Sequence, residues 1–253
     1  MDSQQLPRHY TPLHPDLYTY HEEFIEPRLL EALREGTQDA ILSVMDTPLF
    51  GVFKFACLRR DFCDRLIQEL DHLERSGVEM ARPNSMNRYG AILDTCGFKS
   101  LMDEICARII SPIADILFSS LPSQAPSREA EDGVGKGKGL GLRYHHAFTV
   151  RYSPTQDKKL DKHVDNADIT LNVCLGREGF KGGHLLFQGC KDSAVVRLPK
   201  QLHRYAAEEQ EHRVDHEIGT ALIHLGSHIH QAVKLEEGER INLIVWSKTL
   251  PFE

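Results

Sequence analysis

Two histidines, one aspartate and one arginine in the second half of the chain have the types and spacing that metal chemistry requires. Only one residue separates His163 from Asp165. In an extended segment residues i and i+2 point to the same side, so this imidazole and this carboxylate emerge side by side. His230 lies further along the chain, and Arg240 follows it ten residues later. These four side chains are the candidate site that the rest of the chain has to position.

The side-chain types indicate which chemistry such a site would support. Two histidines and one aspartate on one side of a metal ion, with open positions opposite, are the ligand set of non-haem Fe(II) oxygenases. We expect His163, Asp165 and His230 to form this set. An arginine inside a closed barrel needs an anionic partner, and its guanidinium fork matches a carboxylate. Arg240 would then bind the far carboxylate of a diacid that chelates the same metal, which is the geometry that 2-oxoglutarate requires.

The segment that follows Asp165 has the pattern of a strand that lines a pocket. Residues 168–175 alternate between apolar side chains and the smaller Thr170, Asn172 and Cys174. A half-buried strand with water on one side normally carries charge on that side. Small, neutral, hydrogen-bonding groups there predict a pocket wall instead.

The segment from His230 onward predicts a second wall of the same pocket. Two short strands joined by a turn around Gly238 fit the spacing and would place His230 near Arg240 across the pair. On the last strand Arg240, Asn242 and Ile244 share one face. The arginine and the asparagine are therefore expected to look into one cavity.

Helix patterns precede strand patterns along the chain, which favours an α+β fold with a small sheet or barrel packed on N-terminal helices. A stretch rich in Gly, Pro and Ser predicts a flexible loop over about residues 121–141. Short strands punctuated by glycine follow from residue 145. The elements that we predict before that loop are a strand over residues 49–55 and helices over residues 22–34, 38–45, 59–76 and 100–118, the last interrupted at Pro112.

Together these motifs resemble one family. The His163–Asp165 motif, the glycine turn and strand of Gly182–Phe187, and His230 followed by Arg240 are similar to the prolyl/lysyl hydroxylase group of Fe(II)/2-oxoglutarate-dependent dioxygenases. The run Gly238–Trp246 matches the family's G-x-R-x-x-L-x-x-W ending. The likeness is greatest to the domain-containing protein 2 branch of these oxygenases, and it is clear from about residue 146 to residue 248.

The resemblance implies a fold, a domain division and cofactors. It implies a double-stranded β-helix, that is a jelly-roll or cupin-like core, with N-terminal supporting helices. Residues 1–44 would then be a helical extension, and residues 45–253 the dioxygenase domain. Fe(II), 2-oxoglutarate as co-substrate, O2 and ascorbate are the cofactors that the family implies.

The resemblance also implies roles for single residues. His163, Asp165 and His230 would ligate iron, and Arg240 would bind the C5 carboxylate of 2-oxoglutarate. Three further positions complete the co-substrate site: Tyr152, which would reach the co-substrate, and the pocket-wall residues Thr170 and Asn172. The chain departs from the family at Lys234, where proline is common, and at Cys174, where some prolyl hydroxylases have a tyrosine.

The other histidines compete for these roles. His224 and His228 are rivals for the distal ligand position, with His228 the alternative to His230. His212 and His216 have helical metal-ligand spacing, but residues 208–216 are dense in charge and predict an exposed loop. We expect His184 to be exposed, and His145 and His146 either to line the site mouth or to be solvated.

Composition excludes several classes of function. With 30 Lys and Arg against 37 Asp and Glu, the net charge of −7 argues against a surface for nucleic acid or anionic membranes. No apolar run approaches the roughly 20 residues that span a bilayer, and the first residues lack a secretory signal pattern. The six cysteines contain no C-x-x-C pair and predict reduced thiols. We expect an intracellular, cytoplasmic protein.

These observations support three functional hypotheses. The first is a hydroxylase that releases succinate and CO2 and acts on a protein or peptide side chain, with lysine or proline hydroxylation as the type. Asp165 favours hydroxylation, because related halogenases lack this carboxylate. The alternatives are a catalytically weak regulatory module that binds iron and 2-oxoglutarate, and a Zn- or Mn-dependent hydrolase or isomerase, which Arg240 and the glycine turns disfavour. Residues 121–141 and 191–217 are the candidate lids.

Overall fold

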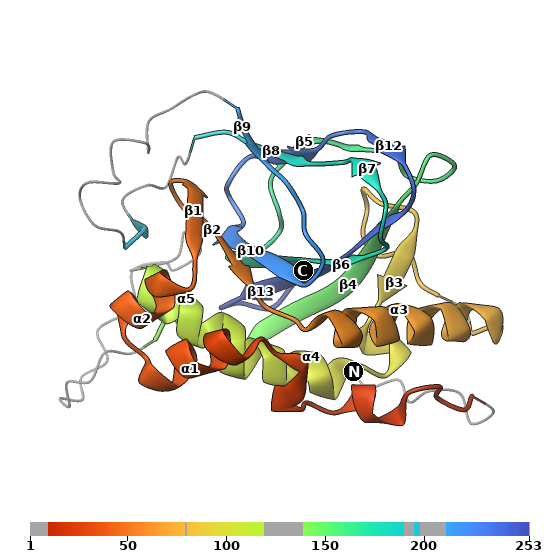
Figure 1. Ribbon diagram of the computed structural model, residues 1–253, viewed down its shortest axis with the longest axis horizontal. Helices are drawn as coiled ribbons and strands as arrows, with labels where there is room; N and C mark the ends of the chain where they lie inside the picture. The colour runs from red at the N-terminus through yellow and green to blue at the C-terminus, as the bar shows by residue number, and fades with distance from the viewer. Residues whose placement is uncertain (1–9, 79, 119–138, 190–194, 198–210, 253) are drawn as a thin grey trace.

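The described part of the chain forms three layers (Figure 1). The computed structural model describes residues 10–78, 80–118, 139–189, 195–197 and 211–252. Helices cover one face of a seven-stranded antiparallel sheet, and a four-stranded antiparallel sheet lies over its other face. This separation of helices and antiparallel sheets is the α+β class expected from the sequence.

The helical layer comes from the first half of the chain. The long helix α3 occupies Arg60–Arg75, close to its predicted bounds, and buries Phe62, Leu66, Leu70 and Leu73. Since these residues recur every three or four positions, they form one apolar stripe against the sheet. The other helical elements are η1 (Pro15–Tyr18), η2 (Glu22–Phe24), α1 (Pro27–Glu35), α2 (Gln38–Ser43), η3 (Asp94–Cys96), α4 (Lys99–Ile105), η4 (Cys106–Ile110) and α5 (Ser111–Leu117).

Prolines explain two features of this layer. The predicted interruption at Pro112 is confirmed: the π-helical turn η4 separates α4 from α5, and Pro112 lies in the first turn of α5. The single helix predicted over residues 22–34 is wrong, because Glu22–Phe24 and Pro27–Glu35 are separate helices. Pro27 disfavours helical backbone at the residue before it, and its missing N–H suits a helix start.

The predicted strand over residues 49–55 is a hairpin instead. Strand β1 (Asp46–Leu49) pairs with β2 (Val52–Ala56), and the chain reverses between them. Gly51 has a φ of +82°, which glycine adopts without strain. An apolar pattern continues through this turn, so alternation alone does not reveal it.

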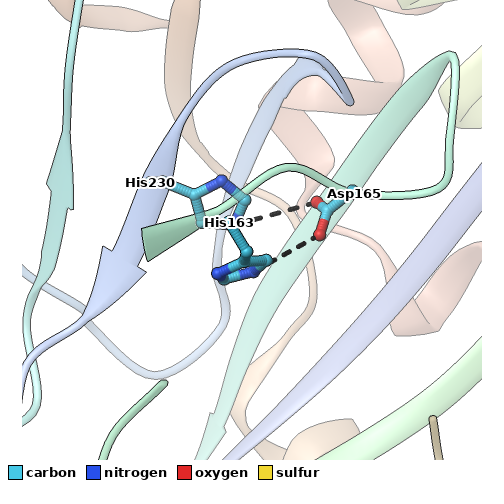
Figure 2. Close-up of side chains that lie close together, drawn as sticks. All are labelled: His163, Asp165 and His230. Atoms are coloured by element: carbon cyan, nitrogen blue, oxygen red, sulfur yellow. Dashed lines mark ion pairs between the residues drawn. The ribbon is translucent and has the colours of Figure 1, made fainter. Parts of the chain in front are cut away.

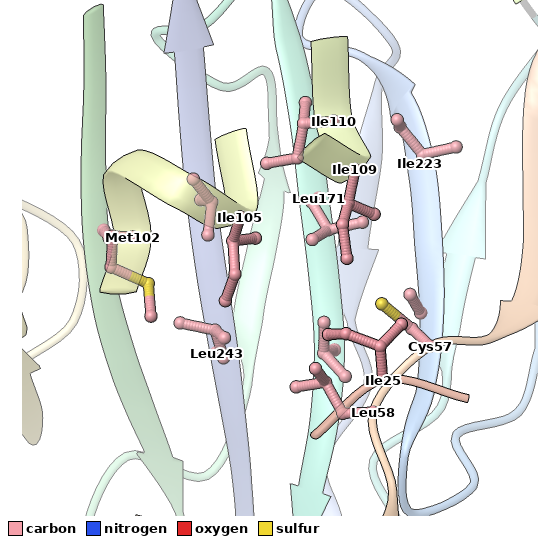
Figure 3. Close-up of a cluster of buried hydrophobic side chains, with 14 of the residues drawn as sticks. Ile25, Cys57, Leu58, Met102, Ile105, Ile109, Ile110, Leu171, Ile223 and Leu243 are labelled. Atoms are coloured by element: carbon pink, nitrogen blue, oxygen red, sulfur yellow. The ribbon is translucent and has the colours of Figure 1, made fainter. Parts of the chain in front are cut away.

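The large sheet has the order β1-β2-β10-β6-β13-β4-β3. Along its central strands β6 (Ile169–Gly176) and β13 (Arg240–Lys248), alternate side chains point to opposite faces. Leu243 lies beside Met102 and Ile105 of the helical layer, and Leu171 lies beside Ile109 (Figure 3). The opposite face of both strands looks toward the small sheet. The remaining strands of the large sheet are β3 (Gly90–Ile92), β4 (Tyr144–Tyr152) and β10 (Thr220–Leu225).

The small sheet has the order β5-β11-β8-β9. Its strands are β5 (Leu160–His163), β8 (Leu185–Phe187), β9 (His212–Val214) and β11 (His230–Ala232). The short strands β7 (Lys181–Gly182) and β12 (Leu235–Glu237) pair separately. The predicted pairing of the strands that begin at His230 and Arg240 is wrong, because β11 pairs with β5 and β8 whereas β13 pairs with β4 and β6. The turn at Gly238 is present, with a φ of +76°.

Several predictions concern segments that the structure describes only in part. Most of the loop predicted over residues 121–141 lies outside the described residues, as do residues 191–194 and 198–210 of the second candidate lid. The exposed loop predicted over residues 208–216 is wrong for its last part, since His212–Val214 is a strand. The division at residues 44 and 45 stays a prediction.

Two further observations bear on the sequence predictions. Among the residues that the structure describes, none of the helices combines the length and apolar character needed to cross a membrane. The described cysteines are free thiols: Cys57, Cys63, Cys96, Cys106 and Cys174.

Candidate metal and co-substrate site

The seven predicted site residues line one pocket between the two sheets. The pocket has about 450 Å³ of space that protein atoms do not fill, part of it open to solvent. Its walls come from β4, β6 and β13 of the large sheet and from β5, β8 and β11 of the small one. The seven are His163, Asp165, His230, Arg240, Tyr152, Thr170 and Asn172.

At the small-sheet end of the pocket, two imidazoles converge on one carboxylate (Figure 2). The Nε2 atom of His163 lies 3.6 Å from Oδ1 of Asp165, and Nε2 of His230 lies 3.8 Å from Oδ2. His163 and His230 are directly opposite each other in the β5–β11 pair, with ring centres 4.3 Å apart. One ligand atom from each of the three residues lies within 4.8 Å of the others, so a single ion could contact all three.

Backbone carbonyls orient both imidazoles. The Nδ1 atom of His163 lies 2.8 Å from the Asp161 carbonyl, and Nδ1 of His230 lies 2.9 Å from the His228 carbonyl. A carbonyl only accepts, so Nδ1 carries the proton in both neutral rings. The lone pair of each ring is then on Nε2, the atom directed at Asp165, which is the tautomer that binds a metal.

Asp165 is held ionised in a buried place. Burial acts to raise its pKa, but His230, His163 and the Thr170 hydroxyl outweigh burial and hold the pKa well below its usual value. Thr170 Oγ1 donates to Oδ2 at 2.7 Å, and the backbone N–H of Asp165 donates to the Gly226 carbonyl at 2.9 Å. The carboxylate is therefore charged and fixed in orientation, as a ligand must be.

Asp165 and burial shift the two histidines in opposite directions. Burial acts to lower the pKa of His163, but the hydrogen bond and charge of Asp165 raise it above its usual value. For His230 burial dominates and lowers the pKa, despite the opposing effect of Asp165. The rival His224 is fully buried beside His230, and burial and the charge of His230 lower its pKa to about 3. The rival His228 lies with Nε2 2.5 Å from the Gln188 carbonyl.

Arg240 lies at the other end of the pocket, and no acidic residue in the described part of the chain forms an ion pair with it. Only 1% of it is exposed, and its Nε and Nη1 atoms have no hydrogen-bond partner among the same residues. Its guanidinium carbon stacks over the Tyr152 ring at 4.7 Å. Burial lowers the pKa of Arg240 from its usual value. A buried cation with free N–H groups fits an anionic ligand such as the far carboxylate of 2-oxoglutarate.

The remaining predicted residues connect the two ends. The Tyr152 hydroxyl accepts from Asn87 at 3.3 Å, and the Asn172 side-chain oxygen accepts from Asn242 at 2.6 Å. The Thr170 hydroxyl donates a hydrogen bond to Asp165, so it contacts a candidate metal ligand.

Three other histidines, His145, His146 and His184, lie outside the candidate metal site. His145 lies 2.8 Å from Asp103, whereas His146 shares the pocket-facing side of β4 and packs against Trp246 and Phe148; neither histidine is among the residues that line the pocket. His184 is half-buried rather than exposed.

Sequence reasoning missed part of the pocket. Asn84, Met86 and Asn87 line it from the loop before β3, where no periodic pattern marks a wall. The Asn84 side chain accepts from the backbone N–H groups of Met86 and Asn87, which shapes this loop. Trp246 also lines the pocket. The sequence could have predicted this, because Trp246 continues the alternation of Arg240, Asn242 and Ile244.

The chain is similar in sequence to iron-dependent oxygenases. Residues 6–122 match the family model of the OGFOD2-like domain. The chain is 34% identical over 248 residues to the 2-oxoglutarate and iron-dependent oxygenase domain-containing protein CP2 of Arabidopsis thaliana, covering 96% of this chain and 57% of the relative. It is 32% identical over 255 residues to domain-containing protein 2 of Xenopus tropicalis, covering 97% and 64%. The chain therefore spans about three fifths of the length of these relatives.

Solved structures support the fold. A prolyl hydroxylase from Trichoplax adhaerens, solved with a peptide of hypoxia inducible factor, has a TM-score of 0.52 at 14% identity, over 90% of this chain and 95% of that one. The non-heme alpha-ketoglutarate-dependent epimerase SnoN has a TM-score of 0.51 at 13% identity, over 88% and 83%. The fold and the sequence thus relate this chain to the 2-oxoglutarate and iron-dependent oxygenases. Within that class its relatives are the domain-containing protein 2 group, as the motifs predicted.

Proposed function

We propose that this protein is an Fe(II)- and 2-oxoglutarate-dependent dioxygenase. The observation that carries the proposal is the presence of two features in one pocket: the His163–Asp165–His230 triad, and the buried guanidinium of Arg240, whose Nε and Nη1 have no hydrogen-bond partner within the described residues. A triad alone would suit several metals and reactions. A cation at the opposite end adds the requirement for a ligand that chelates metal at one end and is anionic at the other.

The residues divide the chemistry between them. Bound Fe(II), with 2-oxoglutarate and O2, supplies an oxidant that converts a substrate C–H to C–OH and releases succinate and CO2. His163, Asp165 and His230 would hold the iron, and their carbonyl and Thr170 partners keep the imidazoles and carboxylate oriented. Arg240 would bind the C5 carboxylate, and Tyr152 would pack against its guanidinium.

The finer assignments rest on the family likeness. We propose that the two facing sheets are those of a double-stranded β-helix, and that ascorbate keeps the iron reduced. We further propose a cytoplasmic enzyme that hydroxylates a protein or peptide side chain of the lysine or proline type. Relatives named as a procollagen lysine hydroxylase, at 23% identity, support this choice.

Turnover of 2-oxoglutarate tests the proposal. Purified chain with Fe(II), 2-oxoglutarate and ascorbate should release succinate and CO2 in equal amounts under air, even slowly without substrate. The His163→Ala variant should not. Equal release from both proteins would overturn the proposal.

A regulatory module that binds both ligands without turnover is the alternative. It predicts that wild-type protein binds 2-oxoglutarate in a metal-dependent way but releases succinate no faster than His163→Ala. Binding and turnover are therefore measured on the same preparation.

A further inference from the structure

His216 lies beside the Arg240 end of the pocket, although it belongs to a run of charged residues. Its Nδ1 atom is 3.4 Å from the side-chain nitrogen of Asn242. The same nitrogen donates to the Asn172 oxygen at 2.6 Å. Asn172 and Asn242 both line the pocket, together with Arg240. The contacts thus form a chain from His216 through one amide to a second amide on the pocket wall.

This chain of contacts assigns each hydrogen. An amide NH2 has two hydrogens, and in this arrangement one points to Asn172 and the other to His216. His216 Nδ1 is then the acceptor, which requires a neutral ring with its proton on Nε2. Burial, followed by the positive charges of Arg240 and Lys54, lowers the pKa of His216 well below its usual value, in agreement with a neutral ring.

Arg240, His216 and Asn242 also carry four buried polar atoms that have no hydrogen-bond partner among the residues that the structure describes. They are Nε and Nη1 of Arg240, Nε2 of His216 and the side-chain oxygen of Asn242. An unsatisfied buried polar group costs about 1–3 kcal/mol, so a group of them indicates that a polar molecule completes this end of the pocket. With the ring neutral and protonated on Nε2, three of the four atoms are donors, which suits an anion.

We propose that His216 is a positioning residue for the co-substrate. It holds the Asn242 amide, which in turn holds Asn172, so that the pocket wall beside Arg240 is preformed for the far carboxylate of 2-oxoglutarate. Without the acceptor at Nδ1, the Asn242 amide keeps only its hydrogen bond to Asn172, and the orientation of both amides on the pocket wall is less fixed. This inference rests on the proposed function, because it concerns the same ligand.

Trp246 gives a direct readout of binding. It is the only tryptophan in the sequence and it lines the pocket, so its fluorescence reports on a ligand placed there. The titrations use 2-oxoglutarate with saturating Mn(II) in the absence of O2, and Mn(II) is titrated separately. Wild-type protein is compared with His216→Leu, which removes the acceptor, and with His216→Asn, whose amide oxygen reaches the Nδ1 position.

We expect His216→Leu to lose affinity for 2-oxoglutarate but not for Mn(II), and His216→Asn to regain it. The Kd for 2-oxoglutarate should rise about tenfold in His216→Leu and return to within about threefold of wild type in His216→Asn. The Kd for Mn(II) should change by less than about twofold in both. If His216→Leu does not fold, His216→Gln replaces it, because its amide reaches past the Nδ1 position and should bind 2-oxoglutarate as weakly.

Three results would overturn the inference. They are an unchanged Kd for 2-oxoglutarate in the variant without the acceptor, an equal loss of metal and co-substrate affinity, or failure of His216→Asn to restore binding. If wild-type protein itself does not bind 2-oxoglutarate, the proposed function fails, and this result is distinct from the other three.

Discussion

The guanidinium carbon of Arg240 lies 4.7 Å from the centre of the Tyr152 ring, and no carboxylate of the described residues forms an ion pair with this buried cation. A cation over an aromatic face gains about 0.5–2 kcal/mol. This is less than the several kcal/mol that burying an unpaired charge costs. The protein without ligand therefore carries an electrostatic cost at Arg240 that a bound carboxylate would remove.

Replacing Arg240 should consequently have opposite effects on stability and binding. Arg240→Met removes the buried charge but keeps much of the apolar stem, so we expect the ligand-free protein to have a higher Tm. The Kd for 2-oxoglutarate should rise at least about 30-fold, because the countercharge is lost. Thermal unfolding with and without Mn(II) and 2-oxoglutarate measures both effects. A lower Tm of the ligand-free Arg240→Met variant would show that Arg240 is structural. Tyr152→Phe is the control: it keeps the aromatic ring, so its Kd for 2-oxoglutarate should stay within about threefold of wild type.

Gly183 is the second determinant of the Arg240 position. A Cβ at residue 183 would lie 2.8 Å from Cδ1 of Leu235 and 3.1 Å from Nη1 of Arg240. Gly183→Ala should raise the Kd for 2-oxoglutarate on the order of tenfold by displacing the guanidinium. Gly179→Ala is the matched control, since Gly179 also has positive φ (+77°) but open space around it. Both variants should lower Tm by about 3–6 °C, and equal 2-oxoglutarate affinities would contradict the proposed crowding.

Thr170 should act on the metal rather than on the co-substrate. Its hydroxyl donates to Oδ2 of Asp165 at 2.7 Å, and loss of such a contact to a metal ligand typically reduces affinity 10–100-fold. We expect Thr170→Val to weaken Mn(II) binding by this factor and Thr170→Ser to restore most of it. At saturating metal the Kd for 2-oxoglutarate should be unchanged. A selective loss of 2-oxoglutarate affinity would instead support the co-substrate role implied by the family.

Metal binding should weaken as the pH falls. The pKa of His163 is raised above 6.5 by Asp165, despite burial, so in the metal-free protein the protonated ring stabilises the fold below that pH. This stabilisation disappears as the pH rises through the folded-state pKa. At pH values below the pKa of His163, a metal ion must displace the imidazole proton to bind. The Kd for Mn(II) should therefore rise about tenfold for each unit by which the pH falls below this pKa, and it should be constant at higher pH. Calorimetry in two buffers of different ionisation enthalpy measures the released proton, and a Kd independent of pH between 6 and 8 would contradict this assignment.

Local alternation predicted which side chains face the pocket. In β6, Thr170 and Asn172 face the pocket whereas Ile169 and Leu171 contact the helices, because a strand between two layers must present its polar face to the cavity. The same reasoning holds for Arg240 and the strand that begins with it. Residue type and period carry this information without any knowledge of strand pairing.

Long-range pairing and irregular loops were not predictable in this way. The pairing of His230 with His163 depends on a contact between distant segments, and no local pattern distinguishes it from a hairpin with the following strand. Asn87 reaches Tyr152 from a loop that has no period. His216 was assigned to an exposed loop because its neighbours are charged, although its Nε2 atom is buried and its Nδ1 atom lies 3.4 Å from the side-chain nitrogen of Asn242 on the pocket wall.

The chain leaves the small sheet at β11, passes through β12 and the turn at Gly238, and enters the large sheet at β13, so the ten residues from His230 to Arg240 form a crossing between the two sheets. Length changes at this turn and within β13 should therefore be tolerated very differently. An extra residue before Arg240 lengthens an exposed connection. An extra residue directly after Arg240 would exchange the faces of the rest of β13, sending Asn242 toward the helices and Ile241 into the pocket. Natural variation in chain length among relatives should accordingly be confined to the turn and absent from the strand.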